Sequence, residues 1–292
     1  MKRYIFFAAV IMLISIYAAS SAVKQITMNP GKGFVNTALP LNEAFEKKTG
    51  IKVVIDNGPG GACGYTLKNL DTDKIDMGIM CCPVTKEEAG KKDLVQIPVV
   101  KDGWVFVVNK SNPIDSLTTE QLRDIYQGRV TNWNEVGGAN AAINPYAYIM
   151  CGPRDERVRQ FLVGERNPKK GIVGIDNSKF GLDIKKVKPG NEENCSQAET
   201  DPNVIVVVPR ADMMGNEPSC SAARNGTVKM ISVDGIFPSD GNIANDTYPV
   251  AMNLFMITKG LPDSSETQYI NFIRSAEGRS IVSKAGIVVP LN

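Results

Sequence analysis

The sequence contains no histidine. Its absence excludes Ser-His-Asp and Cys-His catalysis, histidine ligands for metals and c-type haem attachment. An excess of charge of one sign is also lacking, because 33 Lys and Arg stand against 31 Asp and Glu, and the basic residues are scattered. Nucleic-acid-binding domains instead gather basic residues on one face. We therefore expect a protein that is not an enzyme, needs no cofactor and binds no nucleic acid.

Long apolar runs are scarce, and one such run stands at the N-terminus. Met1-Lys2-Arg3 precedes an apolar stretch from Tyr4 to Ala19, which small residues follow at 20–22. This pattern predicts a cleaved secretory signal peptide over residues 1–22, since the run falls short of the about 20 residues that a membrane-spanning helix needs. An uncleaved anchor is the alternative. We expect the mature protein to be soluble, monomeric, and periplasmic or secreted.

The remaining chain is long enough for one large domain or two ordinary ones. Short apolar strands alternate with amphipathic helices, which predicts a largely parallel sheet with helices on both faces. Residues 169–202 are polar and lack periodicity, and we expect an irregular surface excursion there. Strands are predicted at 25–28, 51–55, 75–80, 104–108, 146–150, 204–208 and 252–258, and helices at 35–48, 65–70, 85–89, 118–126 (with Ser116 as N-cap), 155–163, 265–275 and 277–284.

Six cysteines are present, at positions 63, 81, 82, 151, 195 and 220. In an exported protein an even number suggests three disulfides, although the sequence alone permits every pairing. Cys195 lies inside the irregular excursion. We predict a disulfide between Cys195 and Cys220 that ties this segment down.

Several segments together resemble the phosphate-binding periplasmic proteins, which are substrate-binding components of ABC importers. The resemblance covers nearly all of the chain after residue 22. It is carried by residues 107–113 (VVNKSNP), 117–128 (LTTEQLRDIYQG), 131–138 (TNWNEVGG), 233–239 (VDGIFPS), 247–250 (TYPV) and 272–279 (FIRSAEGR).

The resemblance implies a type II periplasmic-binding-protein fold of the α/β class. Two lobes, each a mixed sheet flanked by helices, would be joined by two crossover strands near 101–110 and 248–258. Lobe 1 would comprise residues 23–102 plus 255–292, and lobe 2 residues 103–254. A small inorganic ligand, a phosphate-like oxyanion, would bind in the cleft between the lobes and pass to the membrane subunits of an ABC importer.

Four loops that precede helices are candidates for the ligand site, at 31–36, 60–64, 80–83 and 151–155. Backbone N–H groups at the start of a helix, together with the positive end of its dipole, suit an anion, and glycine lets the ligand approach the backbone. The expected ligand-binding residues are Gly33, Phe34, Gly61, Cys63, Gly64, Cys81, Cys82, Cys151, Arg154, Asp155 and Arg157.

Four cysteines stand on these loops, in places where the resembled family carries Ser, Thr and Arg. One interpretation is a disulfide, for example between Cys63 and either Cys81 or Cys82. Another is a thiol-lined site, built from Cys63, Cys81, Cys82 and Cys151, for a thiophilic metal or metalloid in transport or sensing. A third is a scaffold or adhesion protein with a degenerate cleft. A redox or thiol enzyme is disfavoured because Cys81 and Cys82 are adjacent rather than spaced Cys-x-x-Cys.

Overall fold

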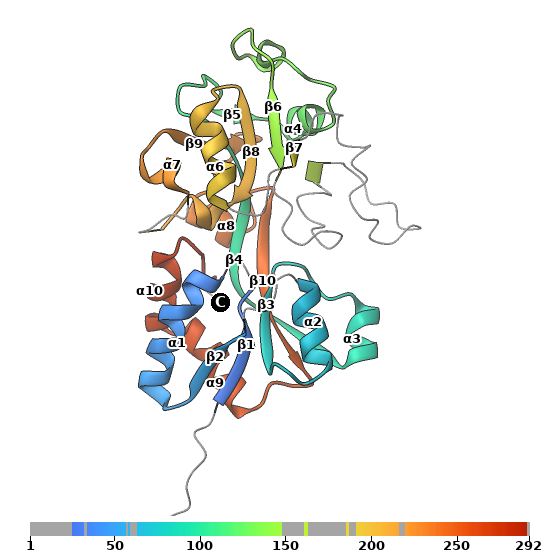
Figure 1. The fold of residues 1–292 in the computed structure, drawn as a ribbon, viewed down its shortest axis with the longest axis vertical. Coiled ribbons are helices and arrows are strands. Elements are labelled where there is room, and N and C mark those ends of the chain that lie inside the picture. Colours follow the sequence, from blue (N-terminus) through green and yellow to red (C-terminus); the bar gives the residue numbers. More distant parts are fainter. Residues whose placement is uncertain are drawn as a thin grey trace, which may run out of the picture.

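The computed structural model describes residues 25–31, 34–56, 58, 63–147, 161–162, 185–186, 191–215 and 220–290. Figure 1 shows two lobes stacked along the long axis of the molecule, with β4 (Leu94–Asn109) and β10 (Ala251–Lys259) running between them. Within these described ranges no helix is long and apolar enough to cross a membrane. The predicted signal peptide lies outside them.

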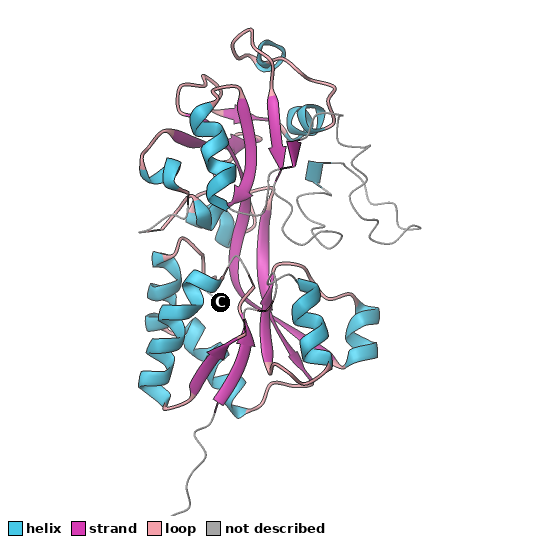
Figure 2. Cartoon of the chain, in the orientation of Figure 1, coloured by secondary structure: helices cyan, strands magenta, loops and turns pink. Residues whose placement is uncertain are grey.

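The lobe that holds the first strands, lobe one, has a mixed sheet in the order β2-β1-β3-β10-β4. Strand β1 (Gln25–Asn29) runs parallel to its two neighbours, β2 (Lys52–Ile55) and β3 (Met77–Met80), while β10 is antiparallel to β3 and β4. Figure 2 shows helices on both sides of these strands. On one side are α1 (Val35–Thr49), α9 (Ser264–Arg274) and α10 (Ala276–Lys284), and on the other are α2 (Cys63–Asp71) and α3 (Lys86–Lys92).

The second lobe, lobe two, is built on the far half of β4. There β4 pairs antiparallel with β8 (Val204–Pro209) and β9 (Val228–Val233). The sheet continues through β6 (Asn144–Ala147) and β7 (Lys185–Lys186), while β5 (Ser116–Leu117) pairs with β9. The helices and helical turns are α4 (Thr119–Tyr126), η1 (Trp133–Val136), α6 (Asn191–Thr200), η3 (Arg210–Asp212), α7 (Ser221–Arg224) and α8 (Asp240–Ala244).

Strand β4 connects the two lobes and begins ten residues earlier than the predicted strand at 104. In its first part Leu94 is buried, residues 95–98 are accessible, and Pro98 lies within the strand. The sheet accommodates the proline at a register shift opposite Leu254 and Phe255, where a bulge removes the need for a ladder N–H. Beyond this point residues 99–108 are all buried, as expected for a strand that passes through the centre of the molecule.

The predicted N-cap of α4 was wrong. Ser116 lies in β5, and Thr118 caps the helix by accepting a hydrogen bond from the N–H of Gln121. The Gln121 side chain returns a bond to the N–H of Thr118, which completes a capping box. This reciprocal pair satisfies two N–H groups at once, so it outcompetes the single hydroxyl of Ser116.

The prediction of an irregular excursion over 169–202 was also wrong in part, because α6 occupies Asn191–Thr200. Its sequence is almost wholly polar, so it has little helical periodicity. Cys195 and Ala198 nevertheless lie one turn apart and are both fully buried. Cys195 forms a disulfide with Cys220, as predicted, and the two Cα atoms are 5.7 Å apart. Tertiary packing and this covalent bond therefore stabilise a helix that propensity alone does not favour.

Candidate functional site

The topology of lobe one brings three loops together at one edge of the sheet. Strands β1, β2 and β3 are parallel neighbours, so their carboxyl ends lie at the same edge. Asn29 ends β1, Asp56 follows β2, and Cys81 and Cys82 follow β3. Open α/β sheets bind ligands beyond the carboxyl ends of their strands. This edge is therefore the candidate site.

Polar side chains join the strand ends to the start of α2. Asn29 is fully buried, and its amide donates to the carbonyl of Asp56 at 2.6 Å. Its side-chain oxygen accepts from the Thr66 hydroxyl at 3.0 Å and from the N–H of Gly31 at 3.2 Å. A single amide side chain thus holds β1, β2 and α2 in register at the edge.

Asp56 forms the second polar link. Its carboxylate accepts from the Tyr65 hydroxyl at 2.9 and 3.1 Å and from the N–H of Gly58 at 3.0 Å. The hydrogen bond to Asp56, with a smaller contribution from burial, raises the pKa of Tyr65. Asn29, Asp56 and Thr66 were not among the site residues predicted from the sequence. The sequence pattern could have indicated Asn29 and Asp56, because each of these polar residues directly follows a predicted apolar strand.

Cys63, Cys81 and Cys82 gather at the same edge. Cys63 is the first residue of α2, and the other two follow β3. Cys63 and Cys82 are each 5% exposed, whereas Cys81 is half-buried. The Cys81 and Cys82 sulfurs are 3.8 Å apart, and all three sulfurs lie within 4.8 Å of one another. The disulfide considered between Cys63 and Cys81 or Cys82 is not formed in this structure.

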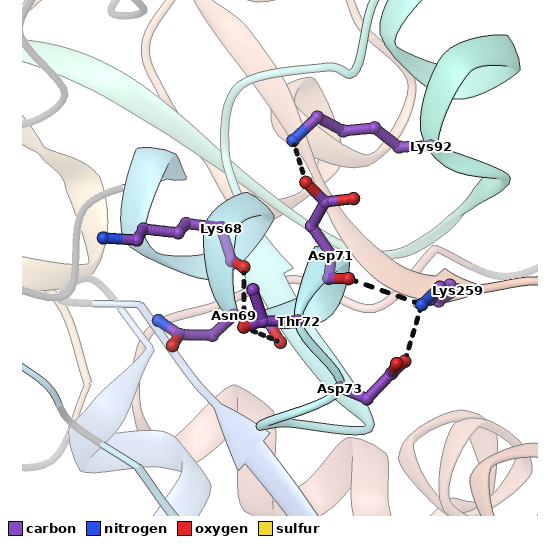
Figure 3. Close-up of polar contacts among 7 residues, drawn as sticks. All are labelled: Lys68, Asn69, Asp71, Thr72, Asp73, Lys92 and Lys259. Carbon is purple, nitrogen blue, oxygen red and sulfur yellow. Dashed lines mark hydrogen bonds and ion pairs between the residues drawn. The ribbon is translucent and has the colours of Figure 1, made fainter.

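Helix α2 is anchored at its opposite end by two lysines (Figure 3). Lys92 of α3 pairs with Asp71 at 2.8 Å. Lys259 of β10 pairs with Asp73 at 2.7 Å and also donates to the carbonyl of Asp71. Cations at the C-terminus of a helix oppose the negative end of its dipole. These contacts hold α2 between α3 and β10 and thereby position Cys63.

The other predicted site residues divide into two groups. Phe34 is 1% exposed and precedes α1, so its ring packs in the core, and its part in ligand binding stays a prediction. Gly64 lies in the first turn of α2, where an added Cβ would meet nothing within 4 Å. Outside the described residues are Gly33, Gly61, Cys151, Arg154, Asp155 and Arg157, and their convergence on the site stays a prediction.

A buried charged cluster connects the lobes near the middle of β4. Arg210 is fully buried and donates to the carbonyls of Pro238 at 2.6 Å and Gly286 at 2.7 Å, besides pairing with Asp240. Nearby Asp102 is 3% exposed and accepts from the N–H of Ala211 at 3.2 Å. Burial raises the pKa of Asp102 to about 7. These bonds tie η3 of lobe two to the chain that follows α10.

Two α/β lobes that share their central strands, with loops gathered at a carboxyl edge, define the architecture of type II periplasmic binding proteins. The family model for the PBP superfamily domain matches residues 17–277, and the chain belongs to this superfamily.

Individual proteins are also similar to this chain in sequence or in structure. The phosphate-binding protein PstS of Borreliella burgdorferi is 26% identical over 211 residues, which cover 70% of this chain and 69% of that protein. PstS of Bacillus subtilis is 24% identical over 204 residues, or 70% and 60% of the two chains. A phosphate ABC transporter substrate-binding protein with bound phosphate from Clostridium perfringens superposes with a TM-score of 0.70 at 22% identity, over 92% of this chain and 100% of that one.

Proposed function

We propose that this protein is an exported, non-enzymatic solute-binding protein that captures a phosphate-like oxyanion between its lobes for an ABC importer. The observation that carries the proposal is the convergence of the β1, β2 and β3 carboxyl ends at one edge of lobe one. The names of the relatives support it, because PstS proteins are phosphate-binding proteins. The residues before 23 would direct export and be removed.

The electrostatics of two helices favour an anion at this edge. Helices α1 and α2 have no acidic residue in their first turns. The four-residue α7 also has none, whereas α3, α4, α8, α9 and α10 each carry Asp or Glu there. An acidic residue in the first turn stabilises a helix by neutralising the positive end of its dipole. Its omission from α1 and α2 leaves N–H groups and positive potential for a bound anion.

Closure of the lobes would complete the site. In this proposal residues 23–102 plus 255–292 form one body and residues 103–254 the other, with β4 and β10 at the hinge. Arg154 and Arg157 would then approach the ligand from lobe two and neutralise its charge by bidentate hydrogen bonds. Asp155, on the same loop, would accept a proton from a protonated oxyanion.

Calorimetric titration with phosphate, sulfate and molybdate tests the proposal. We expect phosphate to bind with a single site per chain, and Arg154→Ala to weaken binding at least about tenfold, since a charge-assisted hydrogen bond contributes about 1.5 to 3 kcal/mol. Lys52→Ala, at the amino end of β2 and so at the opposite edge of the sheet, removes the same charge and should leave the affinity unchanged. Absence of binding for all three anions would contradict the proposal and favour a degenerate cleft.

A further inference from the structure

We propose that Cys63, Cys81 and Cys82 form a three-sulfur site for a trivalent metalloid, with arsenite as the probe. The site goes beyond the proposed oxyanion binding, because the ligand would bond to sulfur rather than to backbone N–H groups. It uses side chains from two separate segments, the start of α2 and the end of β3.

The sulfur positions match coordination of one central atom. A trivalent metalloid with a lone pair is pyramidal, so three thiolates about 2.3 Å from it, at angles of roughly 100°, lie about 3.5 Å from one another. The Cys81 and Cys82 sulfurs are already 3.8 Å apart, and the set of three spans no more than 4.8 Å. Side-chain adjustments that shorten these separations by up to about 1.3 Å would therefore bring all three sulfurs onto one atom.

The surroundings of the cluster disfavour a bound group that carries net charge. The sulfurs pack with a separate apolar cluster of lobe one that consists of Leu67, Leu70, Ile75, Met80, Val84, Leu94 and Ile257. Burial of an isolated charge in such surroundings is costly. Three thiolates around a monovalent ion carry two net negative charges, and around a divalent ion one. Three thiolates on a trivalent centre are neutral, so the apolar shell selects the trivalent metalloid.

The binding step balances without an oxidant or reductant. Arsenous acid, As(OH)3, is neutral and remains trivalent throughout. Three As–S bonds form, and three S–H and three As–O bonds break. Each hydroxyl group leaves as water with the proton of one thiol. No net charge enters the apolar cluster at any stage of this exchange.

The loops that carry the sulfurs are held in place before any ligand binds. Thr66, three residues after Cys63, is fixed to Asn29 at 3.0 Å, and the far end of α2 is held by Lys92 and Lys259. Two residues after Cys82, the N–H of Val84 donates to the Gln96 side chain of β4 at 2.9 Å. Half-buried Cys81 gives the ligand a route from solvent. Preorganised ligands lose little conformational entropy on binding.

Native mass spectrometry of the thiol-reduced chain with arsenite tests the site. We expect one arsenic per chain, with a mass gain equal to one arsenic atom less three hydrogens, which identifies three thiols as the ligands. Cys81→Ser should weaken arsenite binding at least about a hundredfold, because it removes one arm of a three-point chelate. This variant changes a half-buried residue, and circular dichroism will verify that it is folded.

Met80→Leu is the matched control, since it replaces a sulfur atom of the same shell with similar volume but removes no thiol. It should bind arsenite with the affinity of the parent chain. Equal arsenite affinity in the Cys81→Ser variant, an adduct that retains thiol hydrogens, or binding of Zn²⁺ or Cu⁺ without binding of arsenite would each overturn the proposal. Phosphate titration of the same samples reports separately on the oxyanion function.

Discussion

The cysteines of the two lobes are buried to a similar extent but differ in whether they form a disulfide. In lobe two Cys195 and Cys220 are fully buried and form a disulfide between α6 and the start of α7. In lobe one Cys63 and Cys82 are almost as buried, yet their sulfurs stay unbonded to each other and to Cys81. Burial therefore does not decide whether cysteines pair. Pairing also requires a suitable geometry between two cysteines, which Cys195 and Cys220 have with their Cα atoms 5.7 Å apart.

The difference in pairing suits a structural role for the lobe-two cysteines and a ligand-binding role for the lobe-one cysteines. The lobe-two disulfide spans a sequence separation of 25 residues and joins the middle of α6, where helix propensity is poor, to the residue before α7. The lobe-one sulfurs lie on loops already fixed by Asn29, Thr66 and Val84. In each lobe, burial nevertheless requires the sulfur group to be neutral, as a disulfide, a thiol or a neutral adduct.

Burial also favours the neutral form of a side chain at the junction of the lobes, where we predict the largest change in the free energy of unfolding. Burial raises the pKa of Asp102 to about 7 from 3.8. Between these two values the folded state keeps a proton that the unfolded state has lost, so stability falls as pH rises. The fall from this group alone is at most about 4 kcal/mol, from about 1.4 kcal/mol per unit of pKa. Above pH 7 it contributes no further change.

Urea unfolding of the parent chain and of Asp102→Asn at pH 4, 5.5 and 7 measures this effect. Asn is neutral at every pH, so the variant should gain stability relative to the parent as pH rises. Other carboxylates titrate in both proteins and cancel in the difference. A stability difference that is constant with pH would contradict a neutral Asp102.

The next largest change in the free energy of unfolding is expected from replacing cysteines, and it differs between the two lobes. Replacing Cys195 and Cys220 with Ser should lower the free energy of unfolding by about 3.5 kcal/mol, from the loop entropy of a cross-link across 25 residues. Cys81→Ser should cost less than about 1 kcal/mol, because it removes no cross-link and its side chain is half-buried. Urea unfolding without reductant checks both values. Equal losses would mean that Cys81 also carries a structural cross-link.

Much of the fold follows from the sequence because lobe one obeys local rules. The amphipathic pattern predicts a helix at 35–48, and α1 occupies Val35–Thr49. Residues 252–258 lie within β10. Lobe two was harder to predict from the sequence. Helix α6 depends on the burial of Cys195 and Ala198, and no local pattern in its polar sequence indicates that burial.

The site was predictable as a set of loops but not as a set of contacts. Alternating strands and helices predict that Cys63, Cys81 and Cys82 approach one edge. They cannot predict whether sulfurs pair, because that depends on side-chain vectors set by packing. The roles of Asn29 and Asp56 also required the structure, since their partners Thr66 and Tyr65 lie up to 37 residues away in the chain.

The proposed function depends most on binding of the oxyanion at the carboxyl edge of lobe one. The alkylation rate of Cys81, followed by peptide mass spectrometry with and without saturating phosphate, tests this placement directly. Cys81 is half-buried at that edge, so a bound anion and the closed lobe above it should slow its alkylation at least about tenfold. An unchanged rate in protein that demonstrably binds phosphate would place the ligand elsewhere and contradict the account.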